Sequence, residues 1–437
     1  MKISKEFAKR RQQLIDSVSR DSIIILPTSH EAVRNNDVTY PFRPDSDFLY
    51  LTGFWEPEAL LVLVPGRSQG DYILFCREKD KDKEIWHGFR QGQEGAQQVY
   101  GADEAYSINQ LDDVLPGLLE NKNRIYYSMG LNQEFDDRLL EWINGMRQKA
   151  RQGMTVPKEF ICLEYLIHEQ RLIKSPQEIK WMKTAAKISI SAHKRAMKFC
   201  QPGQYEYHLE GEIIHEFYKN GCRNDAYPSI VGGGKNACTL HYTENDSKLK
   251  NGDLVLIDAG VEYQGYASDI TRTFPVNGKF SKPQAQLYQL VLDAQIAAFE
   301  QIKPGNRWNE PHEAVIEVLT AGLVELGLLS GDVEQLIADE AYKQFFMHKT
   351  GHWLGLDVHD VGDYKVDGEW REFQAGMVLT VEPGLYVAKH NDVDKKWWNI
   401  GIRIEDDVLV TQKGYEILTK DMPKSINDIE QLMASGV

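Results

Sequence analysis

The chain has 437 residues, with 50 Lys and Arg against 65 Asp and Glu, which gives a formal net charge of −15. This length predicts two or three domains, because a typical domain spans roughly 150 residues. The acidic balance argues against a nucleic-acid backbone or an anionic membrane surface as the main partner, since both attract basic faces. No apolar run reaches the ~20 residues that a membrane span needs.

The five cysteines are odd in number, widely spaced and without a C-x-x-C pair. This usage is typical of free thiols in a reducing compartment rather than of a disulfide framework. The basic N-terminus is followed by Gln12-Gln13-Leu14-Ile15-Asp16 instead of an apolar run, so we expect an amphipathic helix and no signal peptide. The sequence therefore predicts a cytoplasmic protein.

Residues 1–172 are predicted to form a mixed α/β domain. A helix is expected from Ser4 to about Val18. Strands are expected at 23–26, 59–64 and 72–75. The charge run over 79–84 indicates a solvated loop, and a helix over 161–171 would lead to the next domain.

The segment Ser175-Pro176-Gln177-Glu178 predicts the start of a long helix. Serine can cap the helix, proline suits its first position, and glutamate three residues after the cap completes a capping box. The helix should run to about Phe199 and end at Pro202-Gly203. We therefore place a second domain at 173–437.

An internal repeat marks the second domain. Residues 252–260 align with residues 376–384, and each copy is an apolar run that ends in a carboxylate and a glycine turn. Each copy is followed by another carboxylate on a strand-like run. The four acids are, in chain order, Asp258, Asp269, Glu382 and Glu405. The repeat predicts two α/β halves with pseudo-two-fold symmetry that supply two carboxylates each to a shared centre.

Carboxylates at the ends of buried strands need cations, because an unpaired buried charge is costly. The structural alternative is ion pairing, of Asp269 with Arg272 and of Glu405 with Arg403, which lies two residues away on the same strand face. The other alternative is a metal centre. Four acids in matched positions favour the metal centre.

Three of the 12 histidines, His348, His352 and His359, lie within 12 residues, and His241 precedes the first carboxylate. His348 and His352 are four residues apart but lack the glutamate of a zinc-binding H-E-x-x-H helix. Carboxylates with one or two histidines suit manganese, magnesium or cobalt. Four negative charges exceed the need of one divalent ion, so we expect two ions about 3.5–4 Å apart. The remaining histidines could polarise a carbonyl or move protons.

Six segments of the second domain identify a family resemblance: 240–242, 257–260, 268–273, 352–362, 380–386 and 401–406. With these segments the chain resembles the Xaa-Pro aminopeptidase (aminopeptidase P) family of pita-bread metallopeptidases. Residues 42–54 and 85–88 extend the resemblance to the amino-terminal domain. The implied fold is an amino-terminal mixed α/β domain followed by a pita-bread catalytic domain.

The resemblance implies two manganese ions per subunit. Their ligands would be Asp258, Asp269, His352, Glu382 and Glu405. Asp269 and Glu405 would bridge the ions, and Glu382 would also be the general base for a metal-bridging hydroxide. In this mechanism the hydroxide attacks the carbonyl of the first residue of the peptide.

The resemblance also implies roles around the substrate. His359 and His241 would contact the scissile carbonyl and the proline side and help proton transfer. Pocket positions would be His348, Tyr386, Arg403 and Trp86. Trp86 of relatives can reach into a neighbouring subunit's site, so a homo-oligomer, dimer or tetramer, is expected. Relatives usually place glycine at the position of Lys349, where lysine would be strained if φ were positive.

The implied activity is release of the first residue from peptides with proline second. An alternative of the same class is a prolidase, which cuts only Xaa-Pro dipeptides, but the amino-domain resemblance favours the aminopeptidase. A different alternative is a non-catalytic binding protein or a metal-free relative on the same fold. The presence of all five metal-ligand positions argues against that alternative.

Overall fold

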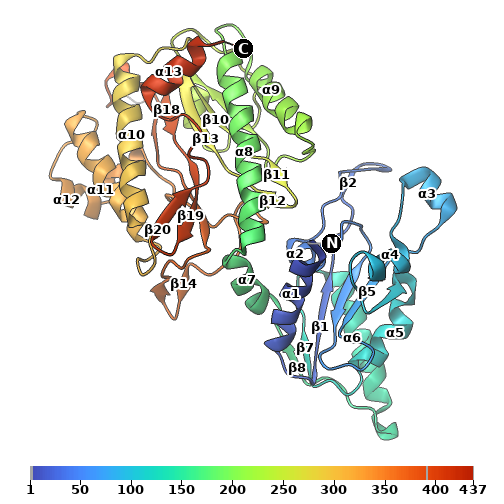
Figure 1. Cartoon of the computed structure of the whole chain (residues 1–437). Coiled ribbons are helices and arrows are strands. Elements are labelled where there is room, and N and C mark those ends of the chain that lie inside the picture. The colour runs from blue at the N-terminus through green and yellow to red at the C-terminus, as the bar shows by residue number, and fades with distance from the viewer. Residues whose placement is uncertain (1–2, 390–391, 437) are drawn as a thin grey trace. The chain divides into compact units, whose positions relative to one another are not determined.

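The computed structural model describes residues 3–389 and 392–436 (Figure 1). The chain divides into two compact units, Met1–Arg171 and Leu172–Val437. Across the described residues, we find no helix with both the length and the apolar character needed to cross a membrane.

The first unit is built on a six-stranded sheet with the order β6-β5-β4-β1-β7-β8. Its strands are β1 (Ser22–Pro27), β4 (Leu60–Leu63), β5 (Tyr72–Cys76), β6 (Glu104–Ser107), β7 (Arg124–Tyr126) and β8 (Glu159–Ile161). The β1–β4 and β4–β5 pairs are antiparallel, and the other three are parallel. Central strands β4 and β5 are buried throughout, which explains their continuous apolar sequence. An exposed hairpin joins β2 (Val33–Asn35) to β3 (Val38–Thr39).

Helices of the first unit supply the rest of its core. They are α1 (Ile3–Asp16), α2 (Ser46–Thr52), α3 (Lys81–His87), α4 (Gly92–Gln98), α5 (Leu111–Leu119), α6 (Gln133–Gln148) and α7 (Glu164–Leu172). Leu115 of α5 and Leu139 and Ile143 of α6 belong to one buried cluster with Ile25 and Phe75 of the sheet. These helix positions recur at helical spacing, so one face of each helix is apolar.

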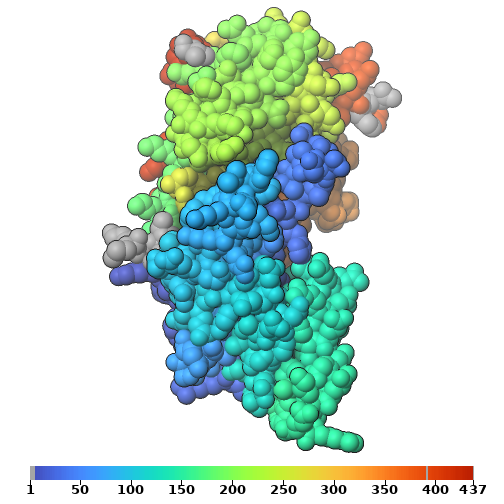
Figure 2. All heavy atoms as spheres, turned by 90° about the vertical axis from the view of Figure 1, so that its right-hand side faces the viewer, coloured from blue at the N-terminus to red at the C-terminus, as the bar shows by residue number. Residues whose placement is uncertain are grey.

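The predicted loop over 79–84 is wrong, because α3 begins there. The Asp80 carboxylate caps the helix by accepting hydrogen bonds from the backbone N–H groups of Asp82 and Lys83. No residue of α3 is buried, and the helix lies on the face that Figure 2 turns toward the viewer. The charge run therefore marks a solvated helix.

The α-helices described in the second unit are α8 (Pro176–Phe199), α9 (Glu206–Lys219), α10 (Lys282–Gln301), α11 (Glu310–Glu325), α12 (Val333–Ala338) and α13 (Ile426–Ala434). The predicted capping box opens α8. The Ser175 hydroxyl accepts from the N–H of Glu178 at 3.3 Å, and the Glu178 carboxylate accepts from the N–H of Ser175 at 2.8 Å.

The strands of the second unit form small sheets that follow the repeat. In the first copy, β9 (Ile230–Gly233), β10 (Leu254–Asp258) and β13 (Thr271–Pro275) form one sheet. In the second, β16 (Val378–Val381), β19 (Asp406–Thr411) and β20 (Gly414–Ile417) form another, beside the pair β17 (Gly384–Val387) and β18 (Ile400–Arg403). Two minor hairpins are β11 (Glu262–Tyr263) with β12 (Tyr266–Ala267), and β14 (Lys365–Val366) with β15 (Glu369–Trp370).

The two copies of the repeat have equivalent surroundings (Figure 1). β10 pairs antiparallel with β13, and β16 pairs antiparallel with β19. Helices α8 and α9 pack against each other and against strands of the first copy, whereas α10 packs against α11 and against β16, β17 and β18 of the second. The predicted pita-bread arrangement with an internal repeat is confirmed.

Candidate metal centre

All four predicted carboxylates lie at strand ends and line one cavity. Asp258 is the last residue of β10, and Asp269 lies two residues before β13. Glu382 directly follows β16, and Glu405 lies between β18 and β19. The matched strands β10 and β16 therefore place Asp258 and Glu382 at equivalent strand ends, next to the same cavity.

His352 lies among these carboxylates. Its Nε2 is 3.4 Å from an oxygen of Asp269 and 3.7 Å from an oxygen of Glu382. Its Nδ1 lies 2.9 Å from the carbonyl oxygen of Trp353. Because Nδ1–H donates to that carbonyl, Nε2 faces the carboxylates, where it donates to them when protonated and can bind a cation when neutral. One ligand atom each from Asp269, His352 and Glu405 lie within 4.8 Å of one another, as one shared cation requires.

Gly351 explains how His352 reaches this position. The segment runs beside β16, and the N–H of Thr380 donates to the carbonyl oxygen of His352 at 2.9 Å. A Cβ at residue 351 would lie 2.0 Å from the carbonyl oxygen of Thr380. Only glycine permits this close approach of two backbones, so the spacing of the histidines reflects a pocket wall rather than a helix.

Arg403 and Tyr227 form hydrogen bonds with the carboxylates of the first copy, Asp258 and Asp269. Arg403 Nη2 donates to Asp258 at 2.6 Å, and the Tyr227 hydroxyl donates to the other oxygen of Asp258 at 2.6 Å. The same hydroxyl also contacts Asp269. One hydroxyl has one proton, so it cannot satisfy both acids. Sequence reasoning missed Tyr227, because nothing in its local sequence distinguishes it from an ordinary loop tyrosine.

The ion pairs considered as the structural alternative are not formed. Arg403 pairs with Asp258 rather than with Glu405, and Arg272 pairs with Asp406 rather than with Asp269. The Glu405 carboxylate accepts instead from the Thr271 hydroxyl at 2.7 Å.

The pKa values of the site residues are consistent with more carboxylates than cations in this cavity. Burial raises the pKa of Asp258, raises that of Glu382 to about 7, and raises that of Glu405 well above its usual range. Burial also opposes ionisation of Asp269, but the hydrogen bond and charge of His352 outweigh it and lower the pKa of Asp269. Against its own burial, His352 has its pKa raised to about 9 by these acids.

These residues fit a divalent metal. Carboxylate oxygens and an imidazole nitrogen are the donors that hard or borderline cations prefer. A cation in their midst would favour the ionised carboxylates and so counteract both the burial and the mutual repulsion that raise their pKa values.

The surrounding cavity has a volume of about 1340 Å³. This exceeds the ~300–1,000 Å³ of typical small-ligand pockets, so it has room for more than a dipeptide. His241 and His359 line it with exposed side chains, and the ring of His359 lies edge-on to that of His352 with centroids 4.4 Å apart. Partial burial and the charge of His352 lower the pKa of His359. His312 also lines the cavity and was missed from the sequence.

His348, Tyr386 and Arg403 form a hydrogen-bonded chain. Arg403 Nη1 donates to the Tyr386 hydroxyl oxygen at 3.0 Å, and that hydroxyl lies 2.8 Å from Nε2 of His348. Burial and the Arg403 charge lower the pKa of His348 to about 3, so its ring is neutral and its Nε2 accepts a hydrogen bond from the Tyr386 hydroxyl. His348 and Arg403 line the cavity, whereas buried Tyr386 is not among its lining residues.

Two further predicted positions are Lys349 and Trp86. Lys349 does not adopt a positive φ, so the backbone strain that lysine could have caused there is absent. Trp86 lies in α3 of the first unit with 81% of its surface exposed, and the cavity is lined by residues of the second unit. Nine of the predicted residues of the second unit line this cavity, and Tyr386 is hydrogen-bonded to two of them, His348 and Arg403.

Comparisons with known proteins agree with this arrangement. Residues 180–412 match the model of metallopeptidase family M24, and residues 7–126 match the aminopeptidase P N-terminal domain. The Xaa-Pro aminopeptidase of Escherichia coli (strain K12) is 45% identical over 432 residues, covering 99% of this chain and 98% of the relative. Human Xaa-Pro aminopeptidase 3 is 34% identical over 450 residues, covering 99% of this chain and 86% of the relative.

Solved structures give the same result. Pseudomonas aeruginosa aminopeptidase PepP has a TM-score of 0.98 at 57% identity, covering 99% of this chain and 98% of that one. Zn-substituted E. coli aminopeptidase P in complex with product has a TM-score of 0.96 at 45% identity, with the same coverage of 99% and 98%. With its full length matched and its carboxylates and His352 gathered in one cavity, the chain belongs to metallopeptidase family M24.

Proposed function

We propose that this chain is an Xaa-Pro aminopeptidase, a metal-dependent hydrolase that releases the first residue of peptides with proline second. The observation that carries the proposal is the convergence of five metal-donor side chains in one cavity of a chain 45% identical, end to end, to an Xaa-Pro aminopeptidase. The five donors are Asp258, Asp269, His352, Glu382 and Glu405.

We assign these five residues to two divalent ions, with Asp269 and Glu405 between them. Four carboxylates carry more negative charge than one divalent ion balances, which supports a pair. Manganese is our proposed ion, because an oxygen-rich site with a single imidazole suits it. Bound ions would supply Lewis-acid polarisation of the scissile carbonyl and activation of water at neutral pH.

Proton transfer is assigned to side chains of the cavity. Glu382, which lines the cavity, takes a proton from the attacking water on a carboxylate oxygen. His359 donates to the oxygen of the scissile carbonyl, and His241 faces the proline side of the bond. Both are accessible in the cavity, so each can meet a bound peptide without a change of the core.

The proline side of the substrate is assigned to the wall formed by His348 and Arg403. Tyr386 stands behind this wall and orients His348 through their 2.8 Å hydrogen bond. Trp86, exposed on α3, is proposed to contact a second copy of the chain in a homo-oligomer. A cytoplasmic location is proposed from the cysteine pattern.

Peptide hydrolysis tests the function. Metal-stripped protein is supplied with manganese and assayed on Ala-Pro-Phe, with Ala-Pro and Ala-Ala-Phe as matched controls. Release of alanine from Ala-Pro-Phe, but not from Ala-Ala-Phe, is expected. Cleavage of Ala-Pro alone would identify a prolidase, and manganese binding without hydrolysis would support a binding protein.

A further inference from the structure

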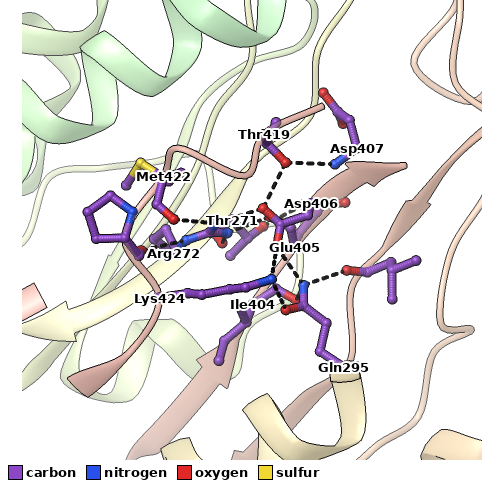
Figure 3. Close-up of polar contacts among 12 residues, drawn as sticks. Thr271, Arg272, Gln295, Ile404, Glu405, Asp406, Asp407, Thr419, Met422 and Lys424 are labelled. Atoms are coloured by element: carbon purple, nitrogen blue, oxygen red, sulfur yellow. Dashed lines mark hydrogen bonds and ion pairs between the residues drawn. The ribbon is translucent and has the colours of Figure 1, made fainter. Parts of the chain in front are cut away.

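A second group of charges, centred on buried Asp406, lies next to Glu405 of the metal centre, and Figure 3 shows its polar contacts. We call it the back cluster, and it comprises Arg272, Gln295, Asp406, Thr419 and Lys424. Asp406 is completely buried and accepts from Arg272 at 2.7 Å, from Thr419 at 2.7 Å and from Lys424 at 2.8 Å. Adjacent side chains of an extended chain face opposite ways, so Glu405 faces the cavity while Asp406 faces the back cluster.

Gln295 of α10 is the member that contacts the metal-site strands most directly. Its Nε2 lies 3.1 Å from the carbonyl oxygen of Val381 and 3.2 Å from that of Ile404. The same nitrogen lies 3.1 Å from the Asp406 carboxylate. Its Oε1 accepts from the Lys424 ammonium at 3.1 Å. An ammonium only donates, so this contact determines which end of the amide faces the strands.

The two carbonyls that Gln295 contacts belong to the residues just before two metal-site acids. Val381 precedes Glu382, and Ile404 precedes Glu405. The strands pair in this region with Val381 opposite Asp406. One buried amide therefore holds together the backbone segments from which both carboxylates of the second copy project.

Other contacts connect the back cluster to the same segments. Arg272 Nη1 donates to the carbonyl oxygen of Glu405 at 2.5 Å. The Asp407 carboxylate, next to the cluster, accepts from the N–H of Asp269 at 3.1 Å. These contacts anchor the backbone at Glu405 and Asp269, but only Gln295 among the cluster side chains touches both the Glu382 and the Glu405 segments in the described residues.

We propose that Gln295 is a positioning residue that sets the separation of Glu382 and Glu405 and thereby the affinity of the site for metal. The inference rests on the proposed metal centre. A cation can be shared by these two side chains only when their backbone segments lie at the right separation, and the hydrogen bonds of Gln295 hold the two segments together from behind. Partners that orient metal ligands typically change metal affinity about 10–100-fold when they are removed.

Calorimetry on the full-length, metal-stripped protein with manganese chloride tests the proposal. Gln295→Met keeps the length of the side chain and removes both ends of the amide, and manganese should bind about 10–100-fold more weakly. The matched control is Gln284→Met on the same helix. Gln284 is buried and donates to the carbonyl oxygen of Gly252 at 2.8 Å, away from the metal-site acids. Its variant should lose thermal stability and bind manganese as the wild type does.

The outcomes separate this inference from the proposed function. Wild-type protein that binds no manganese would contradict the metal centre itself. Wild-type affinity in Gln295→Met, or an equal loss in Gln284→Met, would overturn the positioning role while leaving the metal centre intact. If Gln295→Met does not fold, Lys424→Met decides, because it removes the cation that orients the amide from a partly exposed position. It should weaken manganese binding in the same direction, and unchanged affinity would overturn the proposal.

Discussion

The second unit holds two groups of buried acids on opposite sides of the same strands, and their cations differ. In the back cluster, Asp406 contacts both Arg272 and Lys424. At the metal centre, four carboxylates have Arg403 and the imidazole of His352 as their cationic contacts in the described chain.

The difference appears in the pKa values of two neighbouring residues. Asp406 and Glu405 are both buried, and burial by itself would raise the pKa of each carboxyl group. Arg272 and Lys424 outweigh burial at Asp406 and lower its pKa, whereas Glu405 faces further acids and its pKa is raised well above the usual range. The Asp406 carboxylate is neutralised by protein cations and has a structural role. The four carboxylates of the metal centre have too few protein cations, so this centre can bind a metal ion. Asp407 resembles neither group. Burial raises its pKa, although its carboxylate accepts a hydrogen bond from the backbone N–H of Asp269.

The largest effect is expected from Asp269→Ala, which removes a carboxylate from the metal centre. Hydrolysis of Ala-Pro-Phe should be abolished, because the site loses the acid proposed to lie between two ions. Activity is measured with added manganese, and metal analysis of the purified variant should show less bound ion than in the wild type. Full activity of this variant would refute the assignment.

Asp406→Asn makes the corresponding change in the back cluster. It leaves buried Arg272 and half-buried Lys424 without their anion. Removal of one partner from a buried pair typically costs about 3–5 kcal/mol. Urea unfolding of the metal-free protein measures the free energy of unfolding. A loss below about 1 kcal/mol, the range of exposed ion pairs, would show that Asp406 does not neutralise this cluster.

Unlike Asp406→Asn, Glu382→Gln should increase the free energy of unfolding of the metal-free protein, by an amount that depends on pH. The pKa of Glu382 is about 7 in the fold and ~4.3 in an unfolded chain. The folded protein therefore binds the proton more tightly, and this stabilising contribution is present at low pH and is lost as the pH rises through 7.

Without metal, Glu382→Gln should therefore match the wild type near pH 4, below the pKa of the unfolded chain, and be more stable by about 3 kcal/mol near pH 8. Added manganese should reverse this order, because the wild type then gains the binding energy of the ion. Urea unfolding at the two pH values, with and without manganese, checks both statements. A variant less stable than the wild type at pH 8 without metal would mean that Glu382 already has a sufficient cation.

The smallest effect is expected from Lys349→Ala at the edge of the cavity. Lys349 is exposed and lacks a positive φ, so the free energy of unfolding should change by no more than about 0.5 kcal/mol. Manganese affinity should also equal that of the wild type. A Tm fall of several degrees would show that this loop depends on lysine.

Much of the fold could be predicted because its signals are local. The capping box at Ser175 and the apolar strand over 254–258 lie within a few residues, and the structure forms both. The error over 79–84 has the same origin: a run of charges identifies solvent exposure but does not distinguish a loop from an exposed helix. The Asp80 side chain, which caps the first turn of α3, is the local feature that favours the helix.

The site was partly predictable for a different reason. Matched positions in the repeat identified Asp258 and Glu382 as related strand-end acids before any contact was known. The two-residue spacing of Arg403 and Glu405 suggested that they form an ion pair. Arg403 pairs with Asp258 instead, because neighbours on one strand face do not have to contact each other. Tyr227 and Gln295 carried no sequence signal, since a tyrosine in a loop and a glutamine in a helix are both common.

The sequence by itself determined where the strands end, which acids terminate them and which family supplies their arrangement. The tertiary structure alone decided which cation meets which acid, pairing Arg403 with Asp258 across 145 residues and Arg272 with Asp406 across 134. Strand ends follow from local apolar patterns and turns. The pairing depends on how segments far apart in the chain pack, and that packing divides the acids into a neutralised cluster and a centre that still needs a cation.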